Sequence, residues 1–146
     1  MSEELIVKEG ETPFGVAELI ADVIKGKTVV DVGCGDGSFL EALRDNGAQK
    51  LIGIEEVTSW AWEAAEKGFS ILQGSSWFQP LPDADVYYLW TKDAMGVYLK
   101  AKHEGITGTF VFGHTVRKSL LEFINSLEGE KRYLPDSDWW VFITKL

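Results

Sequence analysis

Hydrophobic residues recur along the chain with two alternating periods. Apolar positions every three or four residues between positions 16 and 24 predict a helix, with Thr12 as its N-cap. The β-branched run 28–32 is typical of a short buried strand. Residues 38–46 again show helical spacing, and Gly47 favours the end of that helix.

The same alternation continues through most of the chain. The predicted strands are residues 51–55, 69–72, 85–90 and 109–112, and the predicted helices are residues 59–67, 93–102 and 116–127. Two further strands are predicted near the end of the sequence, at residues 131–134 and 139–144. Their link, Pro135–Asp138, is too short for a parallel crossover and predicts an antiparallel hairpin.

Alternation of strands and helices favours an α/β fold, with a mostly parallel sheet covered by helices on both faces. The closing hairpin adds an antiparallel edge, so the prediction is a doubly wound, Rossmann-like sheet of seven strands. With 146 residues and no repeat or linker-like stretch, residues 1–146 are expected to form one domain.

Composition narrows the class of protein. The chain is 45% hydrophobic and 25% charged, which excludes a disordered, collagen-like or coiled-coil protein. A single cysteine forbids an internal disulfide and makes a cysteine-based zinc site improbable, so no metal is expected. The 14 basic and 23 acidic residues give a net charge of −9, which disfavours broad contact with nucleic acid or anionic lipid.

The beginning of the sequence does not resemble a secretory signal. Residues 1–10 are partly acidic and contain no apolar run, and no apolar stretch elsewhere is long enough to span a bilayer. We therefore expect a cytoplasmic protein with no membrane partner.

The strongest chemical signal is the segment Asp31–Gly37, which reads DVGCGDG at the end of the first predicted strand. Glycines there allow positive φ and let the backbone approach a ligand without a clash from Cβ. The amides at the start of the following helix favour polar or anionic groups. Glu55 ends the second predicted strand, where a carboxylate can accept hydrogen bonds from ribose hydroxyls. Together they predict a nucleoside-containing ligand.

The glycine spacing separates two families. Nicotinamide-dependent oxidoreductases carry G-x-G-x-x-G, whose third glycine falls at position 38, and this chain has Ser38 there. An acidic residue two positions before G-x-G-x-G resembles motif I of the class I S-adenosylmethionine-dependent methyltransferases. The closing hairpin is also similar to the antiparallel edge of their seven-stranded sheet. A dehydrogenase that uses NAD remains the weaker alternative.

The resemblance implies S-adenosylmethionine as the cofactor. It places Asp31 near the methionine amino group and Glu55 on the ribose, and it places Gly33 and Gly35 beside the methionine and ribose portion. Gly37 and Cys34 belong to the same expected cofactor-binding loop.

The family often carries an aspartate after the third strand, for the adenine amino group. This chain reads QGSSW at positions 73–77, so Ser75 or a backbone carbonyl would replace that aspartate. Trp77 could stack on the adenine, or it could instead cover the edge of the sheet.

The methyl acceptor is expected beyond the ends of the fourth and fifth strands. His114 and Asp93 lie there and are the candidate catalytic residues, His114 as a general base. Each also has a structural reading, as a hydrogen-bonded loop histidine and as a helix cap. The segment 90–93 reads WTKD and lacks the [N/D]-P-P-[Y/F] loop with which this family methylates exocyclic nitrogens. A DNA substrate is therefore disfavoured.

Two functions from different classes remain. One is a methyltransferase that acts on a small molecule or a protein side chain. The other is an S-adenosylmethionine-binding module without its own chemistry, working as a subunit of a larger complex, because no inserted substrate domain is visible. A homodimer is also open.

Overall fold

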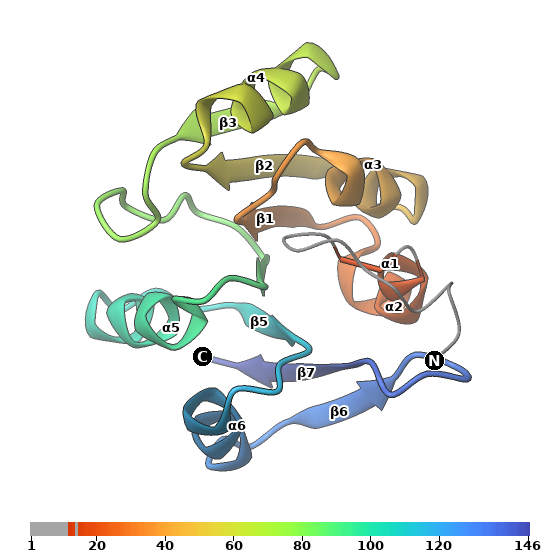
Figure 1. Cartoon of the computed structure of the whole chain (residues 1–146), viewed down its shortest axis with the longest axis vertical. Coiled ribbons are helices and arrows are strands. Elements are labelled where there is room, and N and C mark those ends of the chain that lie inside the picture. The colour runs from red at the N-terminus through yellow and green to blue at the C-terminus, as the bar shows by residue number, and fades with distance from the viewer. Residues whose placement is uncertain (1–11, 14) are drawn as a thin grey trace.

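Among the residues that the structure describes, seven strands form one sheet in the order β3-β2-β1-β4-β5-β7-β6. A computed structural model describes residues 12–13 and 15–146. The strands are β1 (Thr28–Val32), β2 (Lys50–Glu55), β3 (Ser70–Gln73), β4 (Val86–Leu89), β5 (Thr109–Gly113), β6 (Glu130–Tyr133) and β7 (Trp140–Lys145). Figure 1 shows the helices around this sheet.

Strands β1 to β5 pair in parallel, and β7 pairs antiparallel with both β5 and β6. Chain order reverses at β1, since β2 and β3 lie on one side of it and β4 and β5 on the other. In open α/β sheets, ligands bind beyond the carboxyl ends of the strands at such a reversal. The predicted fold class, including the antiparallel hairpin, is confirmed.

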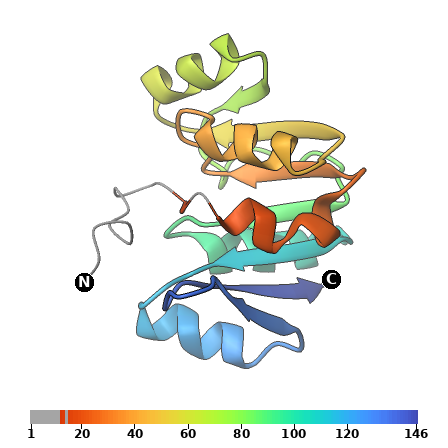
Figure 2. The same ribbon diagram turned by 90° about the vertical axis from the view of Figure 1, so that its right-hand side faces the viewer.

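The helices are α1 (Val16–Leu19), α2 (Ala21–Ile24), α3 (Ser38–Asp45), α4 (Thr58–Glu66), α5 (Ala94–His103) and α6 (Lys118–Asn125). They cover both faces of the sheet because consecutive strand residues point to opposite sides. Val29 packs with residues of α1, α2 and α3, whereas Val30 packs with residues of α5 and α6. Figure 2 shows α1, α2 and α3 in front of the sheet and α5 behind it.

The N-terminal helix differs from the sequence prediction. It begins at Val16 with Gly15 as its N-cap, and it is divided at Ile20, where φ is −109°. Thr12, the predicted N-cap, instead lies with its hydroxyl oxygen 3.4 Å from the phenolic oxygen of Tyr88 on β4. Helical spacing identified the buried side chains, but the short helices follow the sheet in two segments.

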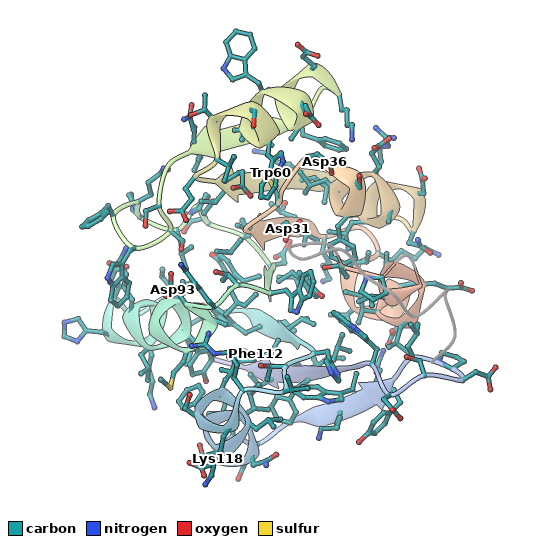
Figure 3. All side chains as sticks on the ribbon, viewed as in Figure 1. Asp31, Asp36, Trp60, Asp93, Phe112 and Lys118 are labelled. Carbon is teal, nitrogen blue, oxygen red and sulfur yellow. The ribbon has the colours of Figure 1, made fainter. Side chains whose placement is uncertain are left out.

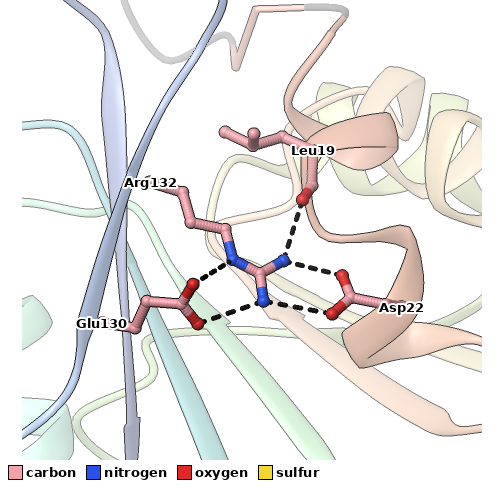
Figure 4. Close-up of polar contacts among 4 residues, drawn as sticks. All are labelled: Leu19, Asp22, Glu130 and Arg132. Carbon is pink, nitrogen blue, oxygen red and sulfur yellow. Dashed lines mark hydrogen bonds and ion pairs between the residues drawn. The ribbon is translucent and has the colours of Figure 1, made fainter.

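An arginine on β6 connects the antiparallel edge to the first two helices. The Arg132 guanidinium donates hydrogen bonds to both carboxylate oxygens of Asp22, at 2.6 and 3.0 Å. It also donates to the Leu19 carbonyl at 3.0 Å and pairs with Glu130, as Figure 4 shows. A planar guanidinium with five donors suits this arrangement. The residues joined here are far apart in the sequence.

Within the part of the chain that the structure describes, no helix combines the length and hydrophobicity that crossing a bilayer requires.

Candidate functional site

A cavity of about 680 Å³ lies at the carboxyl ends of β1, β2, β4 and β5. Its volume is within the range of small-molecule sites. One part of its wall comes from Gly33 and from the loop after β2, beginning with Glu55. The other part comes from the loops that follow β4 and β5. The structure thus brings Gly33, Glu55 and the predicted acceptor side to one space, while Asp31, Cys34, Gly35 and Gly37 of the predicted loop lie outside the cavity wall.

The three glycines of the loop have different local roles. Gly33 lines the cavity with φ +82°, where a Cβ would lie 3.6 Å from Thr91. Gly35, with φ +58°, donates its amide proton to Glu55. Gly37 has φ +89°, and a Cβ there would come within 3.1 Å of Ala64 on α4. Gly33 therefore faces the ligand space, while Gly37 permits α3 and α4 to pack closely.

Glu55 is buried at the end of β2, and the backbone fixes its orientation. Its Oε1 accepts a hydrogen bond from the Gly35 amide at 2.7 Å, and its Oε2 accepts one from the Val57 amide at 2.9 Å. A carboxylate can accept about four hydrogen bonds in total. The side chain therefore keeps acceptor capacity on the cavity side without the freedom to rotate away.

Asp31 is buried in the interior of the sheet beside the loop, and Figure 3 labels it near the centre of the molecule. Burial raises the pKa of Asp31 to about 8, and repulsion from the Glu55 carboxylate adds to this increase. A carboxyl with this pKa is mostly protonated at neutral pH, so Asp31 adds little negative charge beside the loop.

Cys34 is buried by packing against β2. A Cβ on Gly53 would meet the Cys34 sulfur at 2.5 Å, so the absence of a side chain at Gly53 makes room for the thiol. Burial raises the pKa of the Cys34 thiol, followed in size by the effects of Asp31 and Glu55, and the thiol stays protonated. Cys34 supports the loop from within: its thiol donates to the Gly35 carbonyl at 3.7 Å, and its amide donates to the Ile54 carbonyl.

The ends of β4 and β5 are joined by a tryptophan. The indole Nε1 of Trp90 donates a hydrogen bond to the His114 carbonyl at 2.8 Å. A Cβ on Gly113 would approach the Trp90 ring to 2.6 Å, so this glycine is required for the indole to lie across β5. Trp90 also makes an edge contact with Trp139 at 5.2 Å between ring centroids.

His114 lines the cavity and continues this aromatic group. Its ring stacks on Trp139 at 5.1 Å and lies 5.3 Å from Trp140. Burial lowers the pKa of the His114 imidazole, an effect that Asp138 partly opposes. The buried Nδ1 has no hydrogen-bond partner among the described residues. The imidazole in the cavity wall is therefore neutral at neutral pH, which is the form able to accept a proton.

Asp93, Lys92 and Arg117 line the same part of the cavity. Asp93 occupies the N-cap position of α5, but its side chain makes no capping hydrogen bond. The Arg117 guanidinium donates to the Lys92 carbonyl at 2.8 Å and so links the loops after β4 and β5. All three side chains belong to exposed residues.

Of the two residues expected near adenine, only one lines the cavity. Ser75 does, and its hydroxyl oxygen accepts a hydrogen bond from the Trp77 amide at 3.2 Å. Trp77 is not part of the cavity wall, because its ring lies against Gly96 on α5, about 3.1 Å from where a Cβ would be. An indole in that position stabilises the β3–β4 connection against α5.

Apart from Trp60, which the sequence placed near a predicted strand end as a possible lining residue of an aromatic acceptor pocket, sequence reasoning did not assign several residues that the fold brings to the cavity. Trp60 on α4 lines it together with Glu56 and Val57, just after Glu55, and Arg117 lines it from the other side. Figure 3 labels Trp60 beneath α4, with Asp31 between it and Asp93 in this view. Extending the expected site by one helical turn after Glu55 and by two residues after Thr115 would have found them.

The comparisons with known proteins agree with this geometry. Residues 15–80 match the family described as methionine biosynthesis protein MetW. The matched segment contains the glycine loop and Glu55 and covers less than half of the chain. A comparison with curated proteins finds no match.

Solved structures with the same fold are numerous. A TehB-like SAM-dependent methyltransferase from Corynebacterium glutamicum is 20% identical, with 94% of this chain and 91% of that chain covered and a TM-score of 0.66. A ribosomal protein L11 methylase from Lactobacillus delbrueckii subsp. bulgaricus is 15% identical, with 94% and 79% covered and a TM-score of 0.70. An rRNA methylase from Streptococcus thermophilus is 11% identical, with 93% and 98% covered and a TM-score of 0.65. The chain has the fold of the S-adenosylmethionine-dependent methyltransferases.

Proposed function

We propose that this chain, with its methyltransferase fold, binds S-adenosylmethionine in the cavity and transfers the methyl group to a small molecule or a protein side chain. The observation that carries the proposal is the Glu55 carboxylate, which the amides of Gly35 and Val57 hold at the cavity wall. A buried carboxylate with fixed orientation and spare acceptor capacity suits the two hydroxyls of a ribose.

Other residues near the ends of β1, β2 and β3 also suit the cofactor. Gly33 leaves space for a ligand, and the Glu55 carboxylate in the cavity wall favours a cationic group close to the loop. Ser75 offers a hydroxyl group near the end of β3, and Trp60 offers an aromatic side chain. Adenine is a flat base, which aromatic side chains bind by stacking.

When bound, S-adenosylmethionine supplies a methyl group already activated on a sulfonium, so the protein has little covalent chemistry to perform. The chain's task is to orient the acceptor atom in line with the methyl group and to exclude water. Leu89, Trp90 and Leu120 contribute apolar surface to the cavity wall, which lowers the solvent content of the site.

We further propose that His114 removes the proton from acceptors that must lose one. His114 lines the cavity, and burial lowers the pKa of its imidazole, so the neutral form predominates at neutral pH. Asp93 lines the same region and is the alternative proton acceptor.

Calorimetric titration with S-adenosylmethionine, S-adenosylhomocysteine and NAD tests the cofactor. We expect both sulfur nucleosides to bind and NAD to bind much more weakly. Preferential binding of NAD would instead indicate a NAD-dependent dehydrogenase. The absence of binding to either sulfur nucleoside would refute the proposal that the chain binds S-adenosylmethionine.

Transfer of a radiolabelled methyl group into fractions of a cell extract tests the reaction. Label in the small-molecule or the protein fraction supports methyl transfer and identifies the acceptor class. Cofactor binding without label in any fraction instead supports a binding module that works within a larger complex.

A further inference from the structure

The cavity differs in charge between its two halves. The side formed by the ends of β1 and β2 contributes Glu55 and Glu56, whereas the loops after β4 and β5 contribute Lys92 and Arg117. In a chain with net charge −9, two cationic residues in the wall of one half oppose the overall balance. We call the side at the ends of β1 and β2 the cofactor half and the side at the ends of β4 and β5 the acceptor half, after the proposed function. The acceptor half is suited to a ligand of different charge from the one that the cofactor half would bind.

Hydrogen bonds to neutral oxygen atoms hold Arg117 in place. Its Nη1 donates to the Lys92 carbonyl at 2.8 Å, and its backbone amide donates to the Thr115 hydroxyl at 3.1 Å. Within residues 12–13 and 15–146, neither Arg117 nor Lys92 forms an ion pair within 4.0 Å. A guanidinium carries five N–H donors, so several remain for a ligand.

The backbone reinforces this positive charge. Helices α5 and α6 both begin at the cavity, and neither has a side-chain capping hydrogen bond. The first amides of a helix carry partial positive charge and favour anions. Asp93 is the opposing group, a carboxylate in the same half of the cavity wall, and it does not neutralise either cation through a close ion pair.

We propose that Lys92 and Arg117 bind an anionic group, a carboxylate or a phosphate, of a small methyl acceptor. The proposal rests on the methyltransferase function above and narrows its substrate class. Two cationic side chains match one such group, whereas the acidic surface elsewhere disfavours a polyanionic chain. The guanidinium, which lies between two loops, would fix the position of the acceptor relative to the cofactor half.

The test uses simple anions as probes. The protein saturated with S-adenosylhomocysteine is titrated with acetate and with inorganic phosphate, and backbone amide shifts are followed by NMR. Acetamide serves as the neutral analogue, and sodium chloride as the ionic-strength control. We expect saturable shifts at residues 91–94 and 115–118, with dissociation constants of roughly millimolar size. Whichever of acetate and phosphate binds more tightly indicates whether the acceptor carries a carboxylate or a phosphate.

Variants connect the shifts to the two cations. Lys92→Gln and Arg117→Gln should each weaken anion binding about tenfold, and the double variant should abolish saturation. Both residues are exposed, so the fold should tolerate the changes. Lys118→Gln is the matched control, because this neighbouring lysine is outside the cavity wall and is labelled beside α6 in Figure 3. It should bind the anions as the unmodified protein does.

Three results would overturn the proposal: no saturable shift with either anion up to about 100 mM, equal shifts with acetamide, or unchanged affinity in the double variant. Titration of the same samples with S-adenosylhomocysteine separates this failure from that of the proposed function. Cofactor binding without anion binding removes only the anionic acceptor, whereas loss of cofactor binding refutes the methyltransferase proposal itself.

Discussion

The two halves of the cavity are built in different ways. At the ends of β1 and β2, Asp31 and Glu55 are buried, and backbone amides hold the Glu55 carboxylate. At the ends of β4 and β5, Lys92, Asp93 and Arg117 are exposed, and their side chains project from loops. The charged groups of one half are therefore fixed by the fold, while those of the other half are exposed side chains that can be exchanged without disturbing the core.

Proteins described as acting on different substrates share this fold. Structures with this fold include proteins described as a ribosomal protein L11 methylase and as an rRNA methylase. A carboxylate held by backbone amides changes little when surface residues change, whereas exposed charged side chains alter the chemistry of a cavity with each substitution. The halves should accordingly respond differently to mutation.

The largest expected effect comes from the acceptor half. His114→Phe keeps a ring for stacking on Trp139 and Trp140 but removes the nitrogen that can take a proton. With an acceptor that must be deprotonated, methyl transfer should slow by about 100-fold or more. Affinity for S-adenosylhomocysteine should stay unchanged. Single-turnover transfer and calorimetry measure the two quantities.

The pH dependence of methyl transfer by the unmodified protein gives a second test of His114 as the general base. Because burial lowers the pKa of its imidazole, transfer should decline only as the pH falls below the usual histidine range. His114→Phe should remove this decline. An unchanged rate and profile in the variant would assign the role to another group, with Asp93→Asn as the next variant to test.

In the cofactor half, Glu55→Gln should lower the affinity for S-adenosylhomocysteine by about 10- to 100-fold, because a charged acceptor is lost. Since Glu55 also accepts from Gly35 and Val57, the loss could arise through the loop. A 2′-deoxy analogue of the ligand separates the two causes. If Glu55 contacts the ribose, the penalty for removing the hydroxyl should shrink in the variant. Additive effects would point to the loop instead, and Glu63→Gln on the exposed side of α4 is the control.

The buried carboxyl of Asp31 should make the stability of the protein depend on pH. Its pKa is about 8 in the folded protein and near 3.8 when exposed, so the folded state retains a proton that the unfolded state has lost. The contribution of Asp31 to the free energy of unfolding is highest below pH 4. It falls by up to about 1.4 kcal/mol per pH unit as the pH rises to about 8. Urea unfolding of Asp31→Asn should lack this decrease, whereas Asp45→Asn should retain it. Equal slopes in all three proteins would contradict the raised pKa.

The smallest expected effect distinguishes two tryptophans. Trp60 lines the cavity beside Glu56 and Val57, so Trp60→Ala should weaken S-adenosylhomocysteine binding by about tenfold. Trp77 packs on Gly96 outside the cavity wall, and Trp77→Ala should leave the affinity within about twofold. Calorimetry on both variants compares them, and a larger loss at Trp77 would support its stacking on adenine.

Most of the fold followed from hydrophobic periodicity. The strand predicted at 28–32 matches β1, and the strand predicted at 69–72 differs from β3 by one residue at each end. The exception was the first helix, where periodicity identified buried side chains but gave no indication of the break at Ile20. Tertiary packing against the sheet determines that break, and a local pattern does not record it.

The cofactor half was more predictable than the acceptor half for a physical reason. A glycine loop after a strand needs particular residues at particular spacing, because positive φ and close approach exclude others. Arg117 has no such constraint, since its hydrogen bond to Lys92 depends on two loops that meet only in the folded sheet. The same applies to Trp60 and Trp77, which similar sequence context could not separate.

The position of β7 sets an order of assembly. It follows β6 in the sequence but lies between β5 and β6, and β6 pairs with no other strand of the described sheet. During translation, β6 leaves the ribosome first and must wait for β7 before it can pair. The stack of His114 on Trp139 and Trp140 depends on the same hairpin. The glycine loop makes its backbone hydrogen bonds within the segment from β1 to β2, whereas the acceptor side of the cavity also depends on the β6–β7 hairpin.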